Sequence, residues 1–108
     1  MGLENDRVVD AVGIENATGI VVLTIADSWD WNDVYGHLMA LQAKLNTYIS
    51  FVEGGQLLEE YPLAEGCPLT IDIVTKFPMD PKGAELLTMA ADVCRDLEIE
   101  IRTRHVAI

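Results

Sequence analysis

Two segments of the chain alternate between apolar and polar residues. Residues 69–77 and 98–104 each place Leu or Ile at alternate positions, with mostly polar residues between them. A period of two with one polar side is typical of a β-strand that is buried on one face only. A sheet built from such strands has a wet face, so any helices in the chain must cover the opposite face.

The remaining segments complete a predicted architecture. Residues 8–14 and 20–26 are rich in β-branched residues, and the polar link between them ends in Gly19, which predicts a β-hairpin. From Asp30 the apolar period changes to about 3.6, which predicts a helix that stops at the Gly54-Gly55 pair. Its predicted inward stripe consists of Val34, Leu38, Leu41, Leu45, Tyr48, Ile49 and Val52.

A second helix begins at Asp80-Pro81, where the Asp can cap free amides and the Pro occupies the first turn. The resulting order is ββαβαβ. We therefore predict an α+β fold, a two-layer sandwich in which a four-stranded mixed sheet carries two helices on one face. Residues 56–67 form a long connection, which is either functional or contains a helical turn at 57–60.

The length of 108 residues allows one core, so residues 1–108 are predicted to form a single domain with residues 1–6 flexible. Acidic residues outnumber basic ones by 18 to 7, which gives a net charge of −11. Residues 1–66 carry 11 acids and 2 bases (−9), whereas residues 67–108 carry 7 acids and 5 bases (−2). Such a field disfavours nucleic acid and anionic membranes as partners, and it leaves a basic protein partner open.

Several stretches resemble a known family. These stretches are the run from Gly19 to Asp27, the Asp30-Trp31 pair, the segment from His37-Leu38 through Leu41 and Leu45 to Tyr48, and the run from Phe51 to Gly55. Together they resemble a family of small acidic bacterial proteins known only as a domain of unknown function. The resemblance implies a bacterial domain that stands alone, and it supplies no activity, cofactor or catalytic residue.

Candidate chemistry gathers at the predicted junction between the second strand and the first helix. Asp30, Trp31 and His37 lie there, and Tyr61 of the 56–67 loop could cover them, which makes these four residues a candidate pocket. His37 could pair with Asp33 or Tyr48. Because no nucleophile elbow, phosphate loop or metal-ligand spacing accompanies them, we predict no catalytic, cofactor-binding or metal-binding residue. The acids near the helix start are explained by capping and by the helix dipole.

The outer face of the first helix carries small or uncharged residues where a solvated helix in so acidic a chain should carry charges. The residues of this face are Gly36, Met39, Ala40, Ala43, Thr47, Ser50 and Phe51. Small residues let a second helix approach closely, so this face is a candidate homodimer interface. Gly36 supports the idea, because a glycine inside a helix costs about 1 kcal/mol and suggests a close approach.

Two functions from different classes follow. The first is a non-catalytic domain that acts through protein–protein association, as a homodimer. The alternative is a small enzyme or ligand-binding protein that uses the Asp30, Trp31 and His37 junction under the 56–67 loop. We expect the protein in the cytoplasm, because its first residues lack the basic and apolar regions of a signal peptide and only two cysteines are present.

Overall fold

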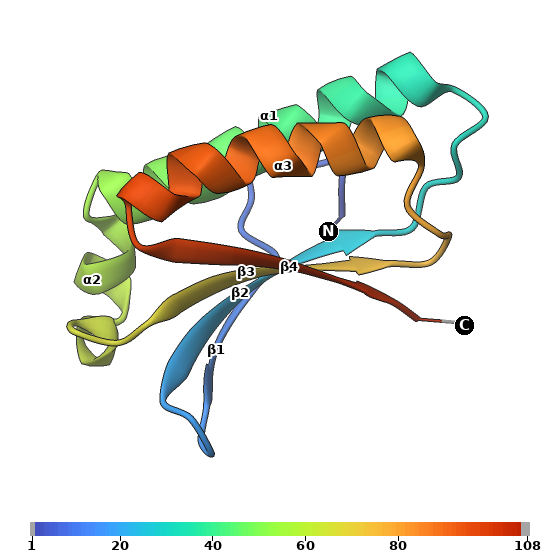
Figure 1. The fold of residues 1–108 in the computed structure, drawn as a ribbon. Helices are drawn as coiled ribbons and strands as arrows, with labels where there is room; N and C mark the ends of the chain where they lie inside the picture. Colours follow the sequence, from blue (N-terminus) through green and yellow to red (C-terminus); the bar gives the residue numbers. More distant parts are fainter. Residues whose placement is uncertain (1, 107–108) are drawn as a thin grey trace.

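The computed structural model describes residues 2–106, which fold into a four-stranded sheet with helices packed on one face (Figure 1). The elements are β1 (Ala11–Glu15), β2 (Ile20–Asp27), α1 (Val34–Glu53), α2 (Gln56–Glu60), a short 3₁₀ turn (Pro62–Ala64), β3 (Leu69–Thr75), α3 (Pro81–Asp96) and β4 (Ile99–His105).

The strands lie in the order β1-β2-β3-β4. The first pair is antiparallel, while β2 with β3 and β3 with β4 are parallel. Each parallel connection carries a long helix back across the same face of the sheet, as right-handed crossovers require. The predicted α+β class, the ββαβαβ order and the mixed sheet are therefore confirmed. The long connection contains the predicted helical turn, as α2.

One hydrophobic core fills the space between the sheet and the two long helices. The sheet contributes Leu23, Ile25, Ile71 and Ile73, none of which is accessible to solvent, and α1 contributes Leu41 from above. Burial alternates along β2, because successive side chains of a strand point to opposite faces of the sheet. The sheet face without helices carries charged residues, which include the buried Asp72.

Both long helices begin at aspartate caps. The Asp33 carboxylate accepts the Gly36 N–H (3.0 Å), and the Asp80 carboxylate accepts the Lys82 N–H (2.9 Å). A Cβ atom added at Gly36 would lie only 2.3 Å from Asp33 Oδ2. The close approach that Gly36 suggested in the sequence is thus made by the cap of its own helix, and it needs no second molecule.

The amino-terminal segment packs against the rest of the fold. Leu3 is buried in the core, and the Gly2 N–H donates to Asp10 (3.1 Å). The predicted flexibility of residues 1–6 concerns motion and stays a prediction, and Met1 lies outside the described residues. Among the helices of residues 2–106, none is long and apolar enough to cross a membrane.

Candidate functional site

His37 is buried at the junction that the sequence singled out, with only 1% of its surface exposed. Its Nε2 lies 2.6 Å from Oδ2 of Asp27, the last residue of β2, and its Nδ1 lies 2.9 Å from the Asp30 carbonyl oxygen. The ring therefore either donates from both nitrogens as an imidazolium or accepts the proton of Asp27 at Nε2. In both arrangements the two nitrogens are occupied by the fold itself. The side-chain partner of His37 is Asp27, and neither Asp33 nor Tyr48, the two partners that the sequence left open, fills this role.

Trp31 closes this junction. Its ring stacks on His37 with 3.6 Å between ring centroids, and its far edge touches Gly83 in the first turns of α3. Trp29 packs against His37 from a second direction at 5.8 Å. The two tryptophan rings thus pack against the imidazole ring of His37. What remains is an open hollow of about 410 Å³ lined by Ser28, Trp29, Asp30, Asp33, His37, Lys76 and Phe77.

The contact between Trp31 and Gly83 gives a testable prediction. An alanine Cβ at position 83 would lie 2.7 Å from Trp31 Cη2 and 2.5 Å from Met79 Sδ. We expect Gly83→Ala to lower the free energy of unfolding by about 1–3 kcal/mol through overpacking, measured by urea denaturation. The matched control is Gly13→Ala, where nothing lies within 4 Å of the new carbon. Equal stability of the two variants would contradict this packing.

Tyr61 does not join the junction. Its side chain is exposed and lines a different hollow of about 570 Å³, together with Arg7, Asn46 and Gln56. The chain from α2 to Tyr61 lies at the far end of α1 from His37 (Figure 1), and 20 helical residues span about 30 Å. The prediction that the 56–67 loop covers the pocket is therefore wrong. Asp30, Trp31 and His37 lie together, but Tyr61 is distant from them.

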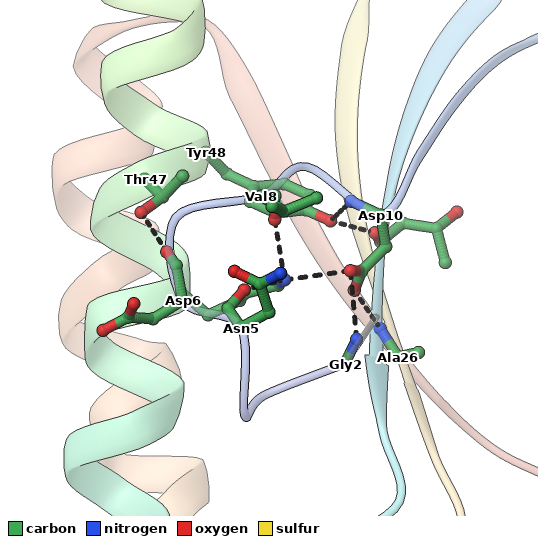
Figure 2. Close-up of polar contacts among 10 residues, drawn as sticks. Gly2, Asn5, Asp6, Val8, Asp10, Ala26, Thr47 and Tyr48 are labelled. Carbon is green, nitrogen blue, oxygen red and sulfur yellow. Dashed lines mark hydrogen bonds and ion pairs between the residues drawn. The ribbon is translucent and has the colours of Figure 1, made fainter.

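A second polar cluster ties the amino-terminal segment to α1, and its centre is Lys44, a residue with no exposed surface. The Lys44 ammonium donates to the carbonyl oxygens of Asn5 (2.7 Å) and Val8 (2.6 Å) and to Asp10 Oδ1 (2.9 Å). All three of its N–H groups are thus used. Figure 2 shows that Asn5, Val8 and Asp10 lie on the amino-terminal segment where it passes beside α1.

Asp10 and Tyr48 complete the cluster. The Asp10 carboxylate also accepts the N–H groups of Gly2 (3.1 Å) and Ala26 (3.2 Å), while the Tyr48 hydroxyl accepts the Asp10 N–H (2.7 Å) and donates to the Thr24 carbonyl oxygen. Burial alone would raise the pKa of Asp10, but the hydrogen bonds and the charge of Lys44 outweigh it and lower that pKa from its ordinary value. Burial, reinforced by the charge of Asp10, raises the pKa of Tyr48.

This cluster was not predicted from the sequence, although a signal was present. Lys44 follows Leu41 by three residues and precedes Tyr48 by four, so it falls within the buried arc of α1. His37 lies four residues before Leu41 on the same arc. The structure buries both, whereas Val34 and Leu38 of the predicted stripe are only half-buried.

The predicted interface residues on α1 have mixed surroundings. Met39 and Ser50 are exposed, and Gly36, Ala40 and Ala43 are partly covered. Thr47 donates a hydrogen bond to the Asp6 carbonyl oxygen, so the amino-terminal segment lies against it (Figure 2). Phe51 belongs to the core and is only 7% exposed. The uncharged face is thus partly occupied by the protein's own chain, and its role as an interface stays a prediction.

Comparison with known families gives one match. Residues 1–107 match the Family of unknown function (DUF6572). The chain belongs to this family. No curated protein and no solved structure matches this DUF6572 chain. Within residues 2–106, no group of three His, Cys, Asp or Glu side chains is placed to hold a metal ion in the DUF6572 domain.

Proposed function

We propose that this DUF6572 domain is a non-catalytic protein that acts through protein–protein association, as a homodimer in the bacterial cytoplasm. One observation supports the proposal: the polar hydrogens and nitrogens of the buried residues His37 and Lys44 are already hydrogen-bonded within the chain. His37 is held at both nitrogens, and Lys44 is held at all three hydrogens. A general acid or base needs a free position within reach of its substrate, and neither group has one.

The surface supports association. In residues 2–106 no helix covers the second face of the sheet, and both outer strands, β1 and β4, have one unpaired edge. Open edges are sites where another chain can add to a sheet. The net charge of the chain, −11, opposes binding to nucleic acid and to anionic membranes. If the domain also binds a different protein, we propose that this partner is basic.

The oligomeric state tests the proposal. Sedimentation equilibrium of the wild-type protein from low to high micromolar concentration should fit a reversible monomer–dimer equilibrium. A chain that sediments as a monomer up to several hundred micromolar would rule out the homodimer. The same titration at two salt concentrations measures how much the acidic field opposes self-association, because salt screens repulsion between charged surfaces.

A further inference from the structure

The unpaired edge of β4 is complementary to itself. We propose that two copies of the chain pair antiparallel along β4, with the two-fold axis at Ile101, and thereby join their four-stranded sheets into one continuous sheet. This inference rests on the proposed homodimer and names the surface that forms it. It differs from the α1 face suggested by the sequence.

The backbone of β4 has the correct groups free. The Val106 N–H donates to the Thr75 carbonyl oxygen (2.9 Å), which turns the backbone groups of the even-numbered residues toward β3. In a parallel pair, alternate residues direct their backbone groups away from the neighbouring strand. Ile99, Ile101 and Thr103 therefore direct their N–H and C=O groups away from β3, in the plane of the sheet, at its free edge. With the axis at Ile101, this residue pairs with its own copy and Ile99 pairs with Thr103. These are all hydrogen-bonded positions of an antiparallel ladder.

The charged residues at this edge are acidic before Ile101 and basic after it. The sequence from position 98 to 104 is Glu-Ile-Glu-Ile-Arg-Thr-Arg. An axis at Ile101 places Glu100 opposite Arg102, at a closely spaced position where side chains interact most. Glu98, the turn residue just before β4, comes level with Arg104 at the end of the ladder. Moving the axis by one residue sets Glu100 against its own copy, or Arg102 against its own copy. One register therefore pairs every charge with its opposite.

The two glutamates of this edge have no ion pair in the described part of the single chain, whereas both arginines are paired with acids of their own chain. Glu98 and Glu100 are exposed and form no ion pair within residues 2–106, and Arg104 is 56% exposed. Arg102 and Arg104 share one buried carboxylate, Asp72, at 3.3 and 2.8 Å. Arg102 Nε makes no hydrogen bond although it is buried. Glu15 also lies 3.8 Å from Arg102, so this edge already holds two acids beside its two arginines, and Glu100 from a second copy would add a further partner.

The surroundings of β4 also suit a second copy. The segment carries two acids and two bases, a local charge of 0 in a chain of −11, so two copies can approach here with the least repulsion. On the helix side, Ala84, Thr88 and Ala91 of α3 face Ile101 and Thr103 across a hollow of about 350 Å³. No charged side chain lines this hollow. The opposite edge, β1, has five residues and no base.

The decisive variant reverses one charge of the edge. Glu100→Arg sets arginine against Arg102 twice in each dimer, and we expect the dissociation constant to rise about tenfold or more in sedimentation equilibrium. The matched control is Glu53→Arg, the same change of charge at the exposed end of α1, which should leave the dissociation constant within about twofold. Because the control lowers the net negative charge equally, it separates local pairing from the overall field.

Two further variants keep the single chain folded. Thr103→Pro removes an N–H that β3 does not use, so it should abolish dimerisation and preserve the circular dichroism spectrum, whereas Thr103→Ala should keep the dimer. Glu98 has a φ of 60°, a left-handed conformation that favours glycine. Glu98→Gly should therefore raise the urea midpoint of the monomer while it weakens the dimer, a pair of opposite effects that general destabilisation cannot produce.

The outcomes separate the two proposals. A wild-type chain that stays monomeric overturns both the homodimer and the β4 edge. A wild-type dimer whose dissociation constant is unchanged by Glu100→Arg and by Thr103→Pro overturns the β4 edge alone and leaves the homodimer standing. Loss of the dimer in both variants, with both controls intact, establishes pairing along β4.

Discussion

Lys44→Met is expected to lower the free energy of unfolding by about 3–5 kcal/mol at pH 7, because it leaves Asp10 as a buried carboxylate without its cation. The methionine fills most of the volume of the lysine stem, so the loss reports the ammonium and not a cavity. The carbonyl oxygens of Asn5 and Val8 also lose their donor. Urea denaturation followed by tryptophan fluorescence measures the effect.

Two comparisons keep this prediction specific. Lys82→Met removes a lysine whose side chain is 67% exposed, and we expect it to change the free energy of unfolding by less than about 0.5 kcal/mol. Asp10→Asn combined with Lys44→Met removes both charges and should be more stable than Lys44→Met alone. A cost below about 1 kcal/mol for Lys44→Met would show that the lysine is not held as described.

The same pair predicts a pH dependence with a definite sign. The hydrogen bonds and the charge of Lys44 lower the pKa of Asp10 in the folded chain, so the unfolded state binds its proton first as the pH falls. The stability contributed by ionised Asp10 is therefore complete above the unfolded pKa and is lost as the pH drops through the lower folded value. The difference in stability between wild type and Lys44→Met should shrink below about pH 4.

His37→Phe is the second large effect, with an expected loss of about 3–5 kcal/mol in the free energy of unfolding. Phenylalanine can retain the stack on Trp31, but it cannot hydrogen-bond to Asp27 or to the Asp30 carbonyl oxygen. Among residues 2–106, the buried side chain of Asp27 would then keep the Trp29 N–H, at 3.1 Å, as its one hydrogen-bond donor.

The control for this prediction is the other histidine. His105 is exposed at the end of β4, and His105→Phe should change the free energy of unfolding by less than about 0.5 kcal/mol. Asp27→Asn in the His37→Phe background should recover part of the loss, since an amide is less costly to bury than a carboxylate. If His37→Phe were as stable as wild type, the hydrogen bond between His37 and Asp27 would not contribute to the stability of the fold.

The strands and helices could be predicted from local sequence patterns, because each of these patterns is compatible with one type of secondary structure. The alternation in β4 gives the predicted half-exposed strand, and the Asp80-Pro81 start of α3 forms an aspartate cap with proline in the first turn. These features depend on residues within a few positions of one another, so the sequence displays them directly. The prediction for residues 69–77 is wrong in one respect: β3 lies between β2 and β4, and its polar residues Thr70 and Asp72 are buried as well.

The candidate site could be predicted only in part because its partners are distant in the chain. Asp10 and Lys44 are 34 residues apart, and Asp27 and His37 are separated by a full strand-to-helix connection. Periodicity assigns lysine and histidine to the surface or to the edge of the core, since isolated charges are rarely buried. The sequence does not reveal which carboxylate will neutralise them, and it placed Tyr61 at the wrong end of α1.

The lysine cluster also orders events during synthesis. Residues 2–10 are synthesised before Lys44 and Tyr48, so the amino-terminal segment lacks its partners on α1 until that helix has been made. The β1–β2 hairpin can form early, but its flank has to wait for α1. The amino-terminal segment of the domain therefore cannot dock in full until α1 has been made, and until then Leu3 remains open to chaperones and proteases.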